Sequence, residues 1–191
     1  MRFEETQIPG VFVIDQQRRE DERGYFARSW CEREFRDHGL NPRVVQCNVG
    51  FSRQMGTLRG MHFQRDPHTE AKLVRCTAGA VFDVALDLRP DSSTFLQWFG
   101  IDLNQRNGRM LYIPEGCAHG YQTLEDKSEI LYQTSRAYAP ESATGVRFDD
   151  PAFGIQWPLP PSSVSEADQN WPAYGSKLAQ PQLTSTSGLP A

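Results

Sequence analysis

The stretch Gly79–Pro90, which reads GAVFDVALDLRP, carries the clearest structural signal in the chain. Successive side chains of a β-strand point to opposite faces, and here one face is apolar while the other carries two aspartates. The apolar face consists of Phe82, Val84, Leu86 and Leu88, and the aspartates are Asp83 and Asp87. This period of two predicts a β-strand over Ala80–Leu88. The turn signal Arg89-Pro90-Asp91 follows directly.

Outward from this strand, Gly and Pro residues separate many more short apolar runs, as in an all-β protein. The further expected strands are Gly10–Asp15, Arg43–Val49, Leu58–Phe63, Ala71–Cys76, Phe95–Leu103, Met110–Ile113, Tyr121–Leu124 and Glu129–Ser135. Only Cys31–His38 has a helical pattern, and Gly39 is placed to end it. Eight or more strands at this spacing predict an all-β fold, a cupin-like jelly-roll barrel with short peripheral helices.

The length of 191 residues suits one domain. We expect that domain to span residues 1–174, and the polar, turn-rich residues 175–191 to form a disordered tail. The formal net charge of −4 argues against a nucleic-acid partner. A charged start and the lack of a long apolar run argue against a signal peptide or a membrane span. With four scattered cysteines expected as free thiols, the sequence predicts a soluble cytoplasmic protein.

Several polar residues interrupt the apolar runs. Arg59 and His62 are three residues apart, so they point to opposite faces of a strand unless the intervening glycine introduces a bulge. Lys72 begins a strand, His119 follows a Pro-Glu-Gly turn, and Tyr132 lies inside a strand. Taken singly, residues of these types are more often structural. Their joint occurrence in a barrel, whose interior is the usual ligand site, favours a functional site.

One motif bears on metal binding. The stretch Pro114-x-Gly116-x-x-His119 resembles the second metal motif of cupins, which supplies one histidine. The first cupin motif needs a His-x-His pair, and the corresponding stretch His62-Phe63-Gln64 lacks the second histidine. The remaining histidines, His38 and His68, fall in the expected helix and in a loop. Three suitable ligands are hard to assemble, so we expect no metal site.

Ordered motifs run through the first 174 residues. In the N-terminal half they are DERGYF (21–26), QCN (46–48), GTLRGMHFQ (56–64), KLVR (72–75) and GAVFDV (79–84). In the C-terminal half they are IPEGCAHG (113–120), LY (131–132), YAPE (138–141), DDP (149–151), IQWP (155–158) and SEAD (165–168). In this order and at this spacing, the motifs resemble those of the dTDP-4-dehydrorhamnose 3,5-epimerase family.

The resemblance implies removal of protons next to the 4-keto group of a nucleotide-linked 4-keto-6-deoxyhexose, with inversion at C3 and C5. It implies that His62 is the base and that Asp168 orients the imidazole and supports its protonated form. Tyr132 would be the acid on the opposite face of the sugar. Lys72 would face the C4 oxygen, where negative charge develops. No cofactor is implied, and the chain has no Gly-rich dinucleotide fingerprint.

The resemblance also implies how the nucleotide is held. Arg59 and His119 would contact the pyrophosphate or neighbouring groups, since the planar guanidinium suits phosphate oxygens. Gln46 and Asn48 would contact the nucleoside, and Tyr138 would stack on the base. In the family, two further residues reach across a dimer interface, which implies a homodimer; these residues correspond to Arg23 and Phe26.

Three positions depart from the family pattern. Cys47 stands where the family commonly has Asp, and Ala167 where it commonly has Lys. Arg28 stands where the usual pattern has Glu. A carboxylate can accept the N3–H of thymine, whereas arginine has only donors. An Arg28 that contacted the base would therefore favour cytosine; otherwise its side chain points elsewhere, and the dTDP-linked sugar is the expected substrate.

Competing functions remain open at this level. The nearest are an epimerase that inverts only C3 or only C5, and one that acts on a CDP-linked sugar. A 3,4-ketoisomerase is disfavoured by the retained Tyr132. A non-catalytic sugar-binding barrel would not need Tyr132 opposite a His62–Asp168 pair, and the chain keeps all three residues.

Overall fold

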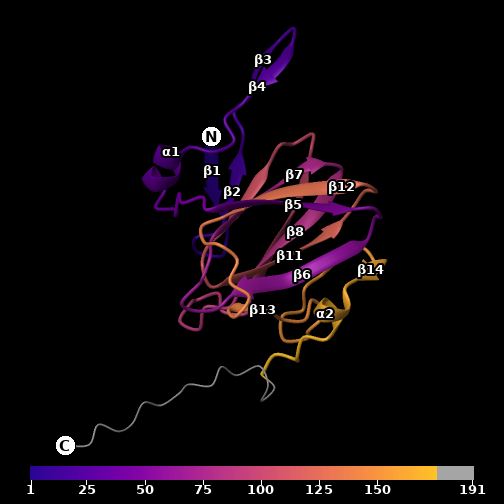
Figure 1. Cartoon of the computed structure of the whole chain (residues 1–191). Coiled ribbons are helices and arrows are strands. Elements are labelled where there is room, and N and C mark those ends of the chain that lie inside the picture. The colour runs from indigo at the N-terminus through magenta and orange to yellow at the C-terminus, as the bar shows by residue number, and fades with distance from the viewer. Residues whose placement is uncertain (176–191) are drawn as a thin grey trace, which may run out of the picture.

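The computed structural model describes residues 1–175, and the expected tail lies outside the described residues except for Gly175. The fold consists of two facing sheets (Figure 1). The first has the order β1 (Arg2–Glu5), β2 (Phe12–Asp15), β10 (Met110–Ile113), β7 (Lys72–Ala78), β12 (Ser128–Thr134), β5 (Gln46–Ser52). The second has the order β13 (Ala143–Gly145), β6 (Thr57–Gln64), β11 (Cys117–Thr123), β8 (Ala80–Asp87), β9 (Trp98–Asn104), and β14 (Ser163–Val164) pairs with β6. The predicted all-β jelly-roll barrel is confirmed.

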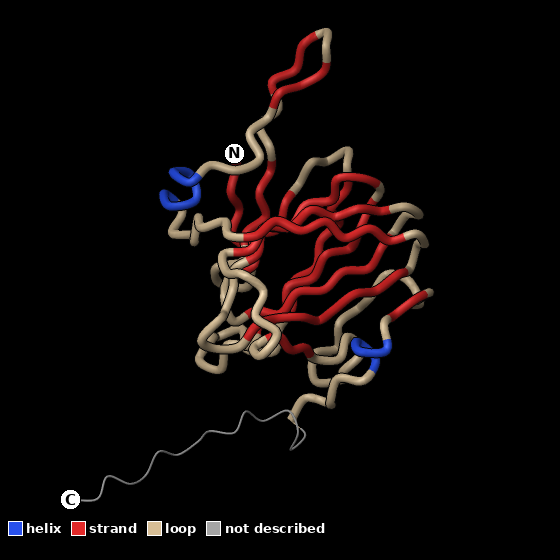
Figure 2. The backbone as a smooth tube through the Cα atoms, viewed as in Figure 1, coloured by secondary structure: helices blue, strands red, loops and turns tan. Residues whose placement is uncertain are grey.

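Two further pieces lie outside the sheets. Strands β3 (Arg19–Asp21) and β4 (Gly24–Phe26) form a hairpin that projects from the barrel, and helices α1 (Glu32–Asp37) and α2 (Glu166–Gln169) sit at its periphery (Figure 2). The expected helix is confirmed as α1, which is followed by Gly39 at a positive φ of 71°. That backbone conformation suits glycine and ends the helix. Among the described residues, no helix is long and apolar enough to span a membrane.

All nine expected strands are present, and all except β10 have shifted ends. The largest shift is in β11, which begins at Cys117 rather than Tyr121, because its small first residues show no alternation yet are buried between two neighbouring strands. The short strands β1, β3, β4, β13 and β14 and the helix α2 were not predicted. Each has only two to four residues, too few to show a period.

The decisive strand β8 is buried on both faces. Its apolar face points away from the other sheet and packs under the C-terminal segment, against Phe153, Ile155 and Trp157. Its other face, which carries Asp83, looks into the barrel, where Val81 and Ala85 join the core between the sheets. The aspartates are therefore interior groups, and each must find polar partners there.

A second apolar layer covers the outside of the first sheet. Phe35 of α1 and Leu40 pack on Ile14, Leu73 and Tyr112. This layer reaches β2, β10 and β7 but leaves the outer face of β5 open, where Val49 and Phe51 are exposed. The sheets are thus closed by apolar packing over β2 and β9, while the side formed by β5, β6 and β12 contains the cavity described next.

Candidate active site

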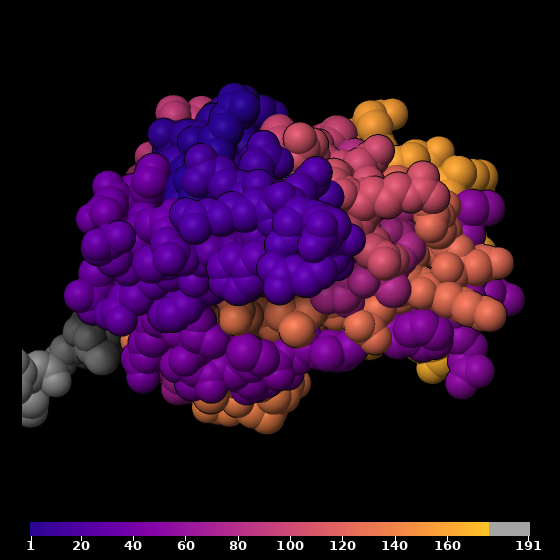
Figure 3. Space-filling view, turned by 90° about the horizontal axis from the view of Figure 1, so that it is seen from above, coloured from indigo at the N-terminus to yellow at the C-terminus, as the bar shows by residue number. Residues whose placement is uncertain are grey.

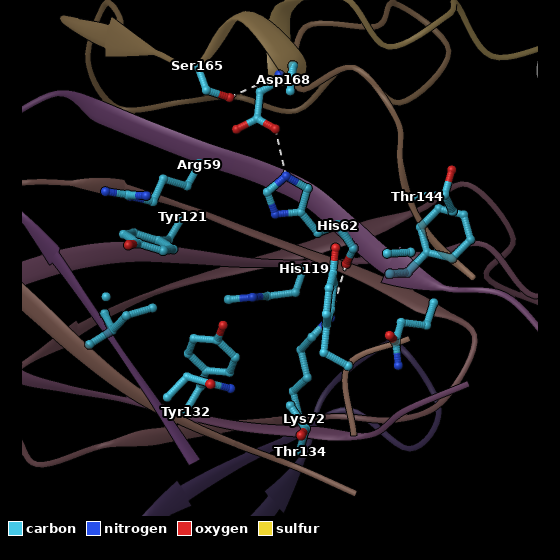
Figure 4. A pocket seen from close by; sticks show the side chains of 18 of the residues that line it. Arg59, His62, Lys72, His119, Tyr121, Tyr132, Thr134, Thr144, Ser165 and Asp168 are labelled. Atoms are coloured by element: carbon cyan, nitrogen blue, oxygen red, sulfur yellow. Dashed lines mark hydrogen bonds and ion pairs between the residues drawn. The ribbon is translucent and has the colours of Figure 1, made fainter. Parts of the chain in front are cut away.

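A cavity of about 900 Å³ lies between the two sheets. Its walls come from β5, β7 and β12 of the first sheet and from β6 and β11 of the second, and the segment around α2 forms a rim. Figure 4 shows side chains of both sheets projecting inward, with Asp168 and Ser165 of the α2 segment at the rim. A volume of this size accepts a ligand larger than a simple sugar.

His62 of β6 and Asp168 of α2 form a hydrogen-bonded pair at the rim. The distance from His62 Nε2 to Asp168 Oδ1 is 2.6 Å. Asp168 is fixed by the Gly60 backbone N–H, which donates to Oδ2, while its own N–H donates to the hydroxyl of Ser165, the N-cap of α2. The Asp168 side chain is 5% exposed and the His62 side chain 49% exposed, so the carboxylate is held while the imidazole faces the cavity.

The ionisation of Asp168 follows from these contacts. Burial opposes its charged form, but the hydrogen bond and the charge of His62, together with the Gly60 N–H, outweigh burial and hold the pKa of Asp168 below its usual value. An ionised partner fixes the tautomer of His62 and stabilises a proton on its ring. The pair can therefore accept a proton from a group in the cavity.

A bulge in β6 places Arg59 and His62 on the same face. Their partners on β11 are Tyr121 and His119, which are only two residues apart and so share a face. The bulge requires glycine: Gly60 has φ of +130°, and a Cβ there would lie 2.5 Å from the Cα of Gly120. The bulge that the intervening glycine could introduce is therefore present. As a result, the side chains of Arg59 and His62 both line the cavity.

The facing sheet contributes Tyr132 of β12 and Lys72 of β7. Figure 4 shows Tyr132 entering the cavity from the side opposite His62. Burial raises the pKa of Tyr132, and the charge of Glu70 raises it further, so the phenol is held in its protonated form. Lys72 Nζ lies 3.0 Å from Glu70 Oε1 and donates to the backbone carbonyl of His62 at 3.2 Å.

A second histidine–aspartate pair lies beside the first. His119 Nε2 is 2.8 Å from Asp83 Oδ1, and both side chains are buried. Asp83 was not singled out from the sequence as a site residue. The signal for it was a carboxylate within an otherwise apolar, interior strand, since a buried charge requires a partner.

The side chains expected to hold the nucleoside gather at one end of the cavity. Gln46 Nε2 donates to Asn48 Oδ1 at 2.9 Å, and Gln46 Oε1 accepts from the Tyr138 backbone N–H at 3.1 Å. The Tyr138 ring is exposed, and Arg59 donates to the Phe51 carbonyl. Five of the expected binding residues line the cavity: Gln46, Asn48, Arg59, His119 and Tyr138.

Arg23, Phe26 and Arg28 do not line the cavity of their own chain. Arg23 pairs with Asp21 at the tip of the projecting hairpin, and Phe26 is 75% exposed. Arg28 Nη1 lies 2.5 Å from Glu34 Oε1 of α1. In Figure 3 the N-terminal segment, in indigo and violet, lies over the face of the molecule turned to the viewer.

The other departures are placed as follows. Cys47 is exposed on the outer face of β5, away from its neighbours Gln46 and Asn48, and Ala167 lines the cavity rim. All four cysteines are free thiols. Among residues 1–175, no three His, Cys, Asp or Glu side chains gather in a way that could hold a metal ion.

Comparisons with known proteins agree with this geometry. The family model described as dTDP-4-dehydrorhamnose 3,5-epimerase matches residues 5–175. The chain is similar to the dTDP-4-dehydrorhamnose 3,5-epimerase of Methanothermobacter thermautotrophicus, with 43% identity over 89% of this chain and 92% of that protein. It also resembles the crystal structure of this enzyme from Elizabethkingia anophelis, with a TM-score of 0.89 and 39% identity over 93% and 98% of the two chains.

A third similar protein carries a bound sugar nucleotide. It is the dTDP-6-deoxy-D-glucose-3,5-epimerase of Legionella pneumophila in complex with dTDP-4-keto-L-rhamnose, with a TM-score of 0.82 and 38% identity over 87% of this chain and 89% of that one. Together with the match of the family model over nearly all described residues, these likenesses show that the chain belongs to the dTDP-4-dehydrorhamnose 3,5-epimerase family.

Proposed function

We propose that this member of the family, an isomerase, inverts C3 and C5 of dTDP-4-dehydro-6-deoxy-D-glucose to give dTDP-4-dehydro-L-rhamnose. The observation that carries the proposal is the half-exposed His62, held by Asp168 at 2.6 Å, on the side of the cavity opposite Tyr132. Inversion needs a base on one face of the sugar and an acid on the other. The two facing sheets supply one group each.

The hydrogens on C3 and C5 are acidic because both carbons flank the C4 carbonyl. We assign the base to His62, which takes the proton while Asp168 stabilises the imidazolium. Removal of the proton moves negative charge to the C4 oxygen. We assign Lys72 to stabilise this enolate, since a preorganised cation beside developing negative charge is a large electrostatic contribution.

Tyr132 then returns a proton to the opposite face of the carbon. Its pKa is raised by burial and by the charge of Glu70, so Tyr132 carries its proton at neutral pH. One base and one acid serve both carbons if the sugar turns in the cavity. After each inversion, proton exchange with water restores His62 and Tyr132.

The nucleotide contacts extend from this centre. We assign Arg59 and His119 to the pyrophosphate, Gln46 and Asn48 to the nucleoside, and Tyr138 to stacking on the base. The exposed ring of Tyr138 beside the Gln46–Asn48 hydrogen bond supports this arrangement. Aromatic stacking combined with amide contacts suits a planar base with polar edges.

We propose that the protein is a homodimer in which Arg23 and Phe26 of one chain reach the cavity of the other. Phe26 is 75% exposed on a projecting hairpin, and β5 is the end strand of its sheet with an open, apolar outer face. Such an edge pairs readily with another chain. Sedimentation of wild type and Phe26→Glu measures this: we expect a dimer that the substitution weakens.

We also place the protein in the cytoplasm, where its four thiols stay reduced.

The Arg28–Glu34 ion pair supports thymine rather than cytosine as the base. An Arg28 already paired on α1 does not discriminate N3 of the base. Calorimetric titration of dTDP and CDP into wild type and Arg28→Glu tests this, and we expect the ratio of the two affinities to stay unchanged. A reversed preference in the variant would assign Arg28 to the base and favour a CDP-linked substrate.

The reaction itself is tested by proton NMR in D2O with dTDP-4-dehydro-6-deoxy-D-glucose. We expect deuterium to enter at both C3 and C5, with the L-rhamno product formed. Exchange at one carbon alone would identify a single-carbon epimerase. Tight binding of the sugar nucleotide without exchange at either carbon would identify a non-catalytic sugar-binding barrel.

A further inference from the structure

Glu70 enters the mechanism above only through the effect of its charge on Tyr132, yet its carboxylate lies in the cavity. The side chain is only 10% exposed and lines the cavity beside Lys72 and Tyr132. A buried carboxylate is costly unless it is paired and hydrogen-bonded. The contacts of its two oxygens therefore indicate what it does.

One carboxylate oxygen holds the ammonium group of Lys72. Glu70 Oε1 lies 3.0 Å from Lys72 Nζ, which also donates to the His62 carbonyl at 3.2 Å. An ammonium group has three N–H donors. Among the described residues the His62 carbonyl is the hydrogen-bond acceptor for Nζ and Glu70 is its ion-pair partner, so the ammonium keeps N–H donors for a ligand in the cavity.

The other carboxylate oxygen ties Glu70 to a rigid part of the barrel. Gln64 Nε2 donates to Glu70 Oε2 at 3.3 Å and to the His68 and Ala137 carbonyls at 3.0 and 3.2 Å. Gln64 Oε1 accepts from the Ala139 backbone N–H at 2.6 Å. Gln64 is itself buried on β6, so Glu70 is an anchored group and not a flexible surface acid.

We propose that Glu70 is a positioning residue, which holds the ammonium of Lys72 between its carboxylate and the His62 carbonyl so that an N–H is directed at the C4 oxygen of the sugar. The inference rests on the proposed function, in which Lys72 stabilises the enolate. A lysine side chain has a long flexible stem that samples many rotamers. Two fixed acceptors remove that freedom before substrate binds, and small misplacements of a catalytic group are costly.

The same carboxylate also acts on Tyr132. Its charge adds to the effect of burial in raising the Tyr132 pKa. Loss of the Glu70 charge should therefore lower the pH at which Tyr132 ionises. A purely structural role for Glu70 would not predict a change at Tyr132 together with a change at Lys72.

The test compares Glu70→Met, which removes both acceptor and charge at similar size, with Glu70→Gln, which keeps one acceptor oxygen. We expect Glu70→Met to lower kcat about ten- to a hundred-fold with KM changed less than about threefold, because a misplaced cation weakens only the transition state. Glu70→Gln should lie between Glu70→Met and wild type. Glu129→Met is the matched control, since Glu129 contacts Thr77 outside the cavity.

A second measurement does not depend on activity. The chain has three lysines, Lys72, Lys127 and Lys177, so nitrogen-15 NMR of the lysine ammonium groups gives few signals, and Lys72→Met identifies the one of interest. The contacts of Nζ should protect the Lys72 ammonium hydrogens from exchange with water. We expect the resulting Lys72 signal to be lost in Glu70→Met and kept in the control, Glu129→Met. If wild type epimerises and Glu70→Met keeps wild-type kcat, or if its Lys72 signal is unchanged, the proposal is overturned. An inactive wild type would refute the proposed function, and the NMR signal would still decide whether Glu70 holds Lys72.

Discussion

Two histidine–aspartate pairs lie at the cavity, and they differ in how far they are buried. His62 and His119 are directly paired across β6 and β11, and each ring nitrogen Nε2 meets a carboxylate at 2.6 and 2.8 Å. The His62 ring is 49% exposed, whereas the His119 ring is 9% exposed and its partner Asp83 is fully buried. The chemical groups are the same, but their access to ligand and water is not.

The difference arises from where the carboxylates come from. Asp83 lies on β8, the next strand of the same sheet, so its pair is enclosed by neighbouring strands. Asp168 comes from α2 at the rim and approaches His62 from outside the sheet. A base must exchange its proton with substrate and solvent, whereas a binding group needs only a fixed donor. The comparison therefore supports the proposed roles, with His62 as the base and His119 as a binding group.

The largest expected effect separates the two histidines. His62→Ala should lower deuterium exchange at C3 and C5 by about 10²–10⁴-fold or more, since a positioned general base is lost. Affinity for dTDP should stay near that of wild type, as measured by calorimetry. His119→Gln should instead weaken dTDP binding and leave measurable exchange at saturating substrate. Near-normal exchange in His62→Ala, or its complete loss in His119→Gln alone, would reverse the assignment.

The second-largest expected effect tests whether Tyr132 is the acid that faces His62. In Tyr132→Phe the base still removes protons, but the opposite face lacks its proton donor. We expect deuterium to enter the unchanged substrate while inversion falls by about 10²-fold or more. Proton NMR in D2O follows both events in one sample. Equal loss of exchange and inversion in a folded variant would give Tyr132 a binding role instead.

The two carboxylates should differ in their effects on stability. Asp83→Ala leaves the buried His119 ring without its partner, so the free energy of unfolding should fall by about 1–3 kcal/mol. Asp168→Ala leaves a His62 ring that water can reach, although the buried Gly60 N–H loses its acceptor, so its loss of stability should be the smaller of the two. Its exchange rate should still drop, because His62 loses its orienting group. Urea unfolding of both variants, with exchange rates alongside, measures this, and equal losses of stability would contradict the contrast in burial.

The smallest effect concerns pH. The folded-state pKa of Asp168 lies below its usual value, so its charged form contributes stability above the unfolded pKa of about 3.9. That contribution should be lost as the pH falls through the folded-state pKa. The difference in unfolding free energy between wild type and Asp168→Asn should therefore shrink as the pH falls from about 4 towards the folded-state pKa of Asp168. A difference that grows as the pH falls below about 4 would have the wrong sign.

Much of the fold could be predicted from the pattern of neighbouring residues in the sequence. The alternation in Ala80–Leu88 and the turn after it predict a strand that the structure forms as β8, and the helix before Gly39 is present as α1. The histidines, Lys72 and Tyr132 stood out because polar residues interrupted apolar strands. These signals are local, since side-chain alternation and turn preferences act over a few residues.

Other features depended on contacts between distant segments. The pattern of β8 separates its two faces but does not say which one lines the barrel, and the aspartate face proved to be the inner one. Glu70 lies two residues before Lys72, on the same face of an extended segment. That spacing alone does not reveal a 3.0 Å ion pair anchored by Gln64.

The sequence by itself determined that the chain forms a strand-rich barrel and singled out polar side chains within its strands, because strand period, turns and polar interruptions are properties of neighbouring residues. Only the tertiary structure decided that His62 is open and His119 closed. Asp168 lies 106 residues beyond His62 in the chain, and the bulge that turns Arg59 and His62 to one face exists only where β6 meets β11. Exposure and pairing depend on what packs from outside the local segment, and therefore only the folded chain distinguishes two chemically identical pairs.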